Sequence, residues 1–142
     1  PFVELQDSPK AAPVPNFSGK RMLLVEDNKL NREIAIEILS NVGFEIDTAA
    51  NGKEAVNAVT SSSAEPYDMI LMDIQMPIMD GYEATRLIRQ MGGARSRTPI
   101  YAMTANTFEE DKRRALDAGM NGHISKPIEV ATLMKTLEGA LD

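Results

Sequence analysis

The 142-residue sequence has no cysteine, and its hydrophobic runs are all short. Without cysteine, the chain can form neither a disulfide framework nor a thiolate metal site. No apolar run approaches the roughly 20 residues of a transmembrane helix, and no basic-then-apolar signal peptide opens the chain. We therefore expect a cytoplasmic segment with no membrane contact of its own, in a parent protein that is free to carry a membrane anchor elsewhere.

Positive charge is also scarce. The chain has 15 Lys and Arg against 21 Asp and Glu, a net charge of -6, whereas a surface that binds nucleic acid is normally basic. Hydrophobic residues make up 43% of the chain, enough for one ordinary core. Residues 1–19 hold four of the eight prolines and predict a linker or tail, with one domain over 20–142. Because the chain opens on Pro-Phe-Val without an initiator Met, we expect a fragment whose neighbour lies on the N-terminal side.

From Lys20 onward, apolar runs typical of strands alternate with segments of helical spacing. The predicted strands are 22–25, 44–49, 69–72, 99–103 and 122–125. The predicted helices are 31–43, 52–60, 81–91, a segment that ends at Gly119, and 128–141. This alternation predicts an α/β protein: a doubly wound (βα)5 sandwich around a five-stranded parallel sheet.

Polar residues follow four of these strands, at the points where the strands end. They are Glu26 and Asp27, Asp73, Thr104 and Lys126. Because ligands of such sheets bind beyond the carboxyl ends of the strands, these side chains are expected in one cleft. Three neighbouring carboxylates repel one another, and a hard cation such as Mg²⁺ relieves the conflict. A carboxylate beside a cation and an ammonium can act as a nucleophile toward a phosphoryl group.

Each of these residues also has an ordinary structural explanation. Adjacent acids such as Glu26 and Asp27 favour helix starts, and Thr104 could cap a helix. His123, the one histidine, is more often a strand or surface residue than a catalyst, and the sequence offers it no partner for general-base work. The matching positions of the acids, the hydroxyl and the lysine favour a phosphoryl site over these explanations.

Four ordered blocks of sequence resemble the receiver domain of two-component response regulators. They are 23-LLVEDNKLN-31, 70-ILMDIQMPIMDG-81, 100-IYAMTAN-106 and 119-GMNGHISKP-127. The resemblance covers roughly residues 20–141. It implies a flavodoxin-like fold with strand order 2-1-3-4-5 and a function as phosphoacceptor in a phosphorelay.

The resemblance also implies roles for individual residues. Asp73 is the phosphoacceptor, and Mg²⁺ is bound by Asp27, Asp73 and the backbone carbonyl of Gln75, with Glu26 assisting through water. Thr104 and Lys126 contact the phosphoryl oxygens. The family's switch pairs the Thr104 position with a ring three residues before the lysine, which here is His123 in place of the commoner Tyr or Phe. The positions expected to tune dephosphorylation or access are Gln75, Asn106 and Ala105.

The wording of these blocks is most similar to receivers of hybrid sensor histidine kinases. This resemblance implies that a kinase phosphohistidine supplies the phosphoryl group and that a histidine-containing phosphotransfer domain receives it. The family's face of fourth helix, fifth strand and fifth helix offers a homodimer contact. A stand-alone single-domain response regulator is the alternative origin. In either case the domain catalyses its own phosphorylation and dephosphorylation, and no independent turnover enzyme is expected.

Three other classes fit less well. An Asp-nucleophile phosphatase of the haloacid dehalogenase type usually has a second Asp two residues after the nucleophile, where this chain has Gln75. A flavodoxin module would need a Ser/Thr/Gly-rich phosphate loop in place of Glu-Asp-Asn. A degenerate docking receiver would be expected to lack one of the acids or the lysine, and all are present.

Overall fold

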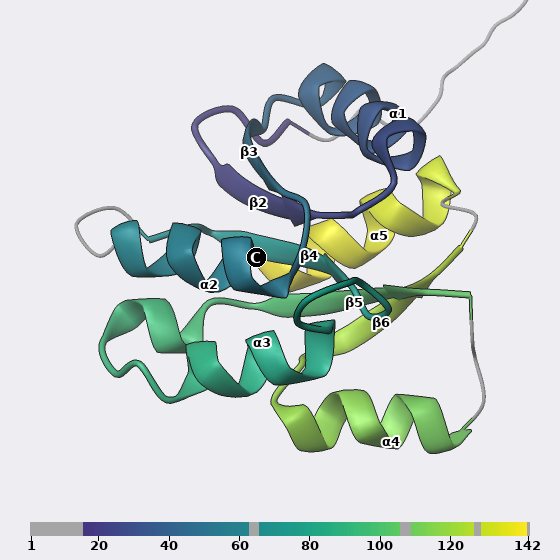
Figure 1. Ribbon diagram of the computed structural model, residues 1–142. Helices are drawn as coiled ribbons and strands as arrows, with labels where there is room; N and C mark the ends of the chain where they lie inside the picture. Colours follow the sequence, from purple (N-terminus) through teal and green to yellow (C-terminus); the bar gives the residue numbers. More distant parts are fainter. Residues whose placement is uncertain (1–15, 63–65, 106–108, 127–128, 142) are drawn as a thin grey trace, which may run out of the picture.

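The computed structural model describes residues 16–62, 66–105, 109–126 and 129–141. Over these residues, strands and helices alternate, with one short 3-10 helix after α3 (Figure 1). The strands are β2 (Arg21–Val25), β3 (Glu45–Ala49), β4 (Met69–Asp73), β5 (Ile100–Thr104) and β6 (Gly122–Ser125). The helices are α1 (Lys29–Asn41), α2 (Gly52–Ser61), α3 (Gly81–Arg89), η1 (Ala94–Arg97), α4 (Glu109–Ala118) and α5 (Val130–Leu141).

All five strands form one parallel sheet in the order β3-β2-β4-β5-β6. Because β2 is the first strand of the expected series, this is the predicted order 2-1-3-4-5, and the flavodoxin-like fold is confirmed. The chain reverses its direction of winding between β2 and β4, which are neighbours: Val25 pairs with Met72. That reversal leaves a crevice beyond the strand ends, where α/β sheets bind ligands.

Helices cover both faces of the sheet (Figure 1). One core cluster joins the sheet to α2, α3 and α4, and a second joins its other face to α1 and α5. In the central strand β4 every residue is buried, as expected of a parallel strand covered on both faces. The alternation in β2 and β4 sends successive apolar side chains to opposite cores, and the backbone of the two strands is held rigidly between them.

The helix ends largely match the expected signals. Asn28, Asn51 and Asp80 cap α1, α2 and α3, and each accepts a hydrogen bond from the amide three residues on. The glycines predicted to stop the first and fourth helices, Gly43 and Gly119, have φ of 107° and 109°. These left-handed angles suit glycine and end the helices as predicted.

The buried face of α1 matches the expected spacing only in part. Of the three residues with helical spacing, Val42 is buried and Ile38 packs against the core, whereas Ile34 is 49% exposed. Within α1, Ala35 and Leu39 are buried beside them. Among the described helices, none combines the length and the apolarity that a membrane crossing requires.

Candidate functional site

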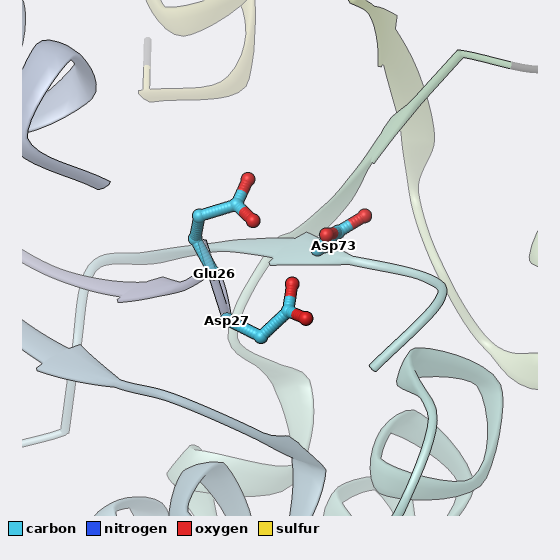
Figure 2. A group of neighbouring side chains, drawn as sticks. All are labelled: Glu26, Asp27 and Asp73. Carbon is cyan, nitrogen blue, oxygen red and sulfur yellow. The ribbon is translucent and has the colours of Figure 1, made fainter. Parts of the chain in front are cut away.

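The five polar residues predicted at the strand ends lie on one edge of the sheet. Glu26 and Asp27 follow β2, Asp73 ends β4, Thr104 ends β5 and Lys126 follows β6. Figure 2 shows the carboxylates of Glu26, Asp27 and Asp73 turned toward a common space beyond the strands. One oxygen from each of the three lies within 4.8 Å of the others. The predicted convergence of the three acids is confirmed.

Glu26 is the most firmly held of these acids, and its side chain is nearly inaccessible, with the residue 2% exposed. Its amide donates to Ala49 O at 3.0 Å, which continues the β2–β3 pairing by one residue. Its carboxylate accepts a hydrogen bond from the amide of Asn28 at 3.1 Å, and its carbonyl accepts one from the Arg32 guanidinium at 2.7 Å. Backbone and side chain are therefore both fixed before any ligand binds.

Lys126 joins the two sides of the site. Its Nζ lies 2.9 Å from Glu26 Oε1 and 3.2 Å from Asp73 Oδ2. Its amide donates to Thr104 O at 2.9 Å, so the residue is positioned through β5 as well. Asp73 Oδ1 accepts a hydrogen bond from the amide of Ile74 at 2.8 Å. One ammonium thus compensates two buried carboxylates.

The electrostatics of the site distinguish the two carboxylates. Burial, reinforced by the neighbouring charge of Glu26, raises the pKa of Asp73 to about 6 and outweighs the attraction of Lys126. Burial also acts on Glu26, but hydrogen bonds from Lys126 and Asn28 outweigh it and lower the pKa of Glu26. Burial opposes the charge of Lys126, yet its contacts with Glu26 and Asp73 raise its pKa. The surroundings therefore favour the charged forms of Glu26 and Lys126 and disfavour the charged form of Asp73.

The donor set suits Mg²⁺. The three acids offer hard oxygen ligands close together, and one of them, Asp27, is exposed to solvent that can complete a coordination sphere. The raised pKa of Asp73 is a second indication, because a divalent cation would stabilise the ionised carboxylate that burial disfavours. The residues present therefore fit the cation that the sequence predicts.

Asp73 opens into a cavity of about 330 Å³. Besides Asp73, the predicted residues Gln75, Thr104, Ala105 and Lys126 line it. Five further residues that the sequence analysis did not identify also line it: Ile74, Asp80, Tyr82, Asp111 and Arg114. Asp111 and Arg114 stand three residues apart on α4, and this i,i+3 spacing is the signal that would have placed both on one helix face. Asn106 lies outside the described residues.

The predicted switch pair shares one face of the sheet. Ala102 pairs with His123 and Thr104 with Ser125, and alternation along parallel strands puts all four side chains on the same side. Ala102 belongs to the core on the side of α2, α3 and α4. Thr104 and His123 are both half-buried there. The two residues therefore lie on the same face of the sheet, on neighbouring strands.

Comparison with known proteins gives one consistent result. A family model for the response regulator receiver domain matches residues 22–138. Hybrid signal transduction histidine kinase L of Dictyostelium discoideum is 41% identical over 120 residues, which cover 83% of this chain and 7% of that protein. Probable histidine kinase 2 of Oryza sativa is 40% identical over 135 residues, 87% of this chain and 13% of that protein. The chain thus spans only a small part of these relatives.

Solved structures agree in fold. The receiver domain of sensor histidine kinase PA1611 from Pseudomonas aeruginosa, with magnesium in its active site cleft, has a TM-score of 0.77 and 39% identity, and covers 87% of this chain and 98% of its own. The receiver domain of Saccharomyces cerevisiae Ssk1, solved with the histidine phosphotransfer protein Ypd1, has a TM-score of 0.76 and 30% identity, with 88% of each chain covered. From its fold, its strand-end residues and these relatives, the chain belongs to the response regulator receiver domain family of two-component histidine kinase signalling.

Proposed function

We propose that this receiver domain accepts a phosphoryl group on Asp73 from a phosphohistidine, with Mg²⁺ bound by Asp27, Asp73 and the Gln75 backbone carbonyl and with Glu26 assisting through water. One observation carries the proposal above the others. A buried carboxylate with a raised pKa lies 3.2 Å from a lysine and within 4.8 Å of two further acids, at the mouth of a cavity. Such a site combines a nucleophile with preorganised positive charge.

The transfer is a displacement at phosphorus. An oxygen of the Asp73 carboxylate forms the new O–P bond, the P–N bond to the donor imidazole breaks, and the imidazole nitrogen leaves with the bonding electrons and takes up a proton. Bound Mg²⁺ would supply charge neutralisation for the acids and the phosphoryl oxygens. Asp27 and the Gln75 carbonyl complete its protein ligands in this proposal, and Glu26 assists through water.

Lys126 and Thr104 contact the phosphoryl group once it is bound to Asp73. The Lys126 ammonium already lies against Asp73, and phosphorylation would replace one negative charge there with a larger one. Thr104 lines the same cavity and offers a hydroxyl that can donate to a phosphoryl oxygen. Its movement would pass to His123 on the shared face of the sheet. Gln75 and Ala105 line the cavity. In this proposal they tune access for the hydrolytic water, and Asn106 has the same role.

A partner surface adjoins the site on the side of α1. Leu30 is 65% exposed and Ile34 49% exposed, an unusual pair of apolar side chains on the first two turns of a helix. Ile34 also lines a second, mainly apolar cavity of about 400 Å³ that reaches Lys126. The Ssk1 receiver was solved with a histidine phosphotransfer protein. A domain of that class, or the phosphohistidine domain of a kinase, would dock on Leu30 and Ile34 and bring its histidine to Asp73.

The relatives favour a hybrid histidine kinase as the parent protein. In this proposal residues 1–19 are the linker and residues 20–142 the receiver, which sends the phosphoryl group to a phosphotransfer domain in the cytoplasm. A stand-alone response regulator is the alternative. A homodimer through α4, β6 and α5 would be compatible with either origin.

Intact mass measurement after incubation with acetyl phosphate tests the central step. We expect one phosphoryl adduct that requires Mg²⁺ and is absent from Asp73→Asn. Beryllofluoride should give the corresponding amide shifts. An adduct that survives Asp73→Asn, or no adduct at any Mg²⁺ concentration, would reject the proposal. Repeated release of phosphate from small phosphoesters would instead support the Asp-nucleophile phosphatase.

A further inference from the structure

Arg114 of α4 is the second cationic residue that lines the Asp73 cavity, after Lys126. Its guanidinium carbon lies 4.5 Å from the centroid of the Tyr82 ring, in a cation–π contact that joins α4 to α3. Tyr82 is 4% exposed and belongs to the core, whereas Arg114 is exposed to solvent. Among the described residues, none forms a hydrogen bond or an ion pair with the Arg114 side chain. Its charge is therefore held by an aromatic face alone.

The two cations of the cavity differ in their partners. Lys126 is committed to Glu26 and Asp73 at 2.9 and 3.2 Å. Asp80, another lining residue, caps α3: one of its carboxylate oxygens accepts a hydrogen bond from the amide of Glu83. A dianionic group added to Asp73 would meet a lysine that is already shared, and a guanidinium whose five donors are unused. Guanidinium groups bind phosphoryl oxygens more strongly than they bind aromatic faces at exposed sites.

Resting on the proposed function, we infer that the Arg114 guanidinium binds the phosphoryl group on Asp73 and that this binding moves α4. In the unmodified protein the Tyr82 ring holds the guanidinium. The phosphoryl group competes with the ring for it, and because Arg114 is part of α4, its transfer toward Asp73 displaces that helix relative to α3. The Tyr82 ring and the phosphoryl group thus compete for the same Arg114 guanidinium.

A purely structural contact predicts different behaviour. If Arg114 only packs α4 on Tyr82, loss of either partner would loosen the helix, and both variants would bind a phosphoryl mimic more weakly or equally well. If the ring competes with the phosphoryl group, the two variants shift the affinity in opposite directions. The direction of the Tyr82 effect therefore separates the two explanations.

The test uses the full chain, Mg²⁺ and beryllofluoride, with the affinity taken from amide shifts. Arg114→Gln is expected to weaken binding about three- to fivefold, as for an exposed charge contact, and Arg114→Lys to restore most of it. Tyr82→Leu is expected to tighten binding about two- to fivefold. Arg113→Gln, a neighbouring arginine that does not line the cavity, is the charge-matched control and should match the unmodified chain.

A second readout is the Arg114 Nε–H resonance, which should shift away from its ring-current position when beryllofluoride binds. If Arg114→Gln binds like Arg113→Gln, or if Tyr82→Leu weakens binding while remaining folded by thermal unfolding, the inference is wrong. If Tyr82→Leu does not fold, the Arg114 variants and the resonance decide. If the unmodified chain binds no beryllofluoride, the proposed function fails with the inference, whereas binding without an Arg114 effect overturns the inference alone.

Discussion

Gly81 packs directly against the backbone of Asp73. A Cβ at position 81 would stand 2.4 Å from the carbonyl oxygen of Asp73 and 3.1 Å from the Cα of Ile74. The Gly81 amide donates to Ile74 O at 2.8 Å, which closes the loop between β4 and α3 onto the end of the strand. The absence of a side chain at residue 81 therefore lets this loop pack directly against the backbone of Asp73.

Gly81→Ala is expected to destabilise the protein by about 2 kcal/mol or more, because the added methyl forces the Asp73 backbone to move. The rate of phosphoryl acceptance should fall as well, since the nucleophile shifts with its backbone. Gly139→Ala is the matched control, since no atom lies within 4 Å of its added Cβ in α5. That control should gain about 0.5–1 kcal/mol from helix propensity. Urea unfolding and acetyl phosphate kinetics measure both effects, and equal stability of the two variants would contradict this account.

Ile78 lies in the same loop with φ of 72°, the one described non-glycine residue with a positive φ. A β-branched side chain is strained in this region, and Ile78 gains little in return because it is 78% exposed. Ile78→Gly should therefore stabilise the fold by about 1 kcal/mol through relief of this strain. Thermal unfolding measures the change. A lower stability for Ile78→Gly than for the unmodified chain would show that the side chain makes a contact that outweighs the strain.

The raised pKa of Asp73 predicts a pH dependence of stability. Because the folded state holds the proton up to about pH 6 and the ordinary pKa is 3.8, the free energy of unfolding should fall as the pH rises between those values. Asp73→Asn lacks this loss. Without divalent cations at pH 7, the free energy of unfolding of Asp73→Asn should exceed that of the unmodified chain by up to about 3 kcal/mol. Chemical unfolding from pH 4 to 7 in EDTA measures the difference, and a difference that does not change with pH would refute the assignment.

Mg²⁺ should reduce the difference in unfolding free energy between Asp73→Asn and the unmodified chain, because the cation stabilises the ionised Asp73 in the folded state alone. The cation is expected to raise the midpoint of thermal unfolding of the unmodified chain more than that of Asp73→Asn. Asn57→Asp, an acid added on α2, tests whether a general charge effect is sufficient. An equal response of all three proteins would argue against a site at the three acids.

Lys126→Met removes the charge that two buried carboxylates share. We expect a loss of about 1–3 kcal/mol, since Glu26 and Asp73 are then left in one cleft without compensation. The second change Asp73→Asn should recover much of this loss, because it removes the repulsion between the acids. Phosphoryl acceptance should fall strongly while the far-UV spectrum stays unchanged. Additive effects in the double-mutant cycle would mean that Lys126 and Asp73 do not interact.

Ile34→Asp tests the docking surface on α1. The substitution places a charge on an exposed apolar position, so it should cost little stability. Transfer from a phosphorylated histidine phosphotransfer domain should slow about tenfold or more, the effect of losing a central apolar contact. Modification by acetyl phosphate, which needs no docking surface, should change much less. Equal losses with the two donors would show that Ile34 acts on the Asp73 site itself.

Much of the fold follows from local pattern. Continuous apolar runs such as Met69–Met72 predict strands buried on both faces, and glycines such as Gly43 and Gly119 end helices at the residues expected. The polar ends of the strands could also be predicted, because parallel strands share one carboxyl edge. Glu26, Asp27, Asp73, Thr104 and Lys126 were identified for that reason. The functional roles assigned to them remain predictions until the experiments above are done.

Other features could not be read from neighbouring residues. Ile34 shares the helical spacing of Ile38 and Val42, which face the core, yet Ile34 lies at the surface, because the packing of α1 on the sheet decides its exposure. Arg114 and Tyr82 are 32 positions apart and meet only because α3 and α4 pack on the same face of the sheet. The sequence by itself determined which chemical groups end the strands, since that depends on residue order alone. Only the tertiary structure decided the distances between these groups, their burial and the raised pKa of Asp73, because all three arise from contacts between residues far apart in the chain.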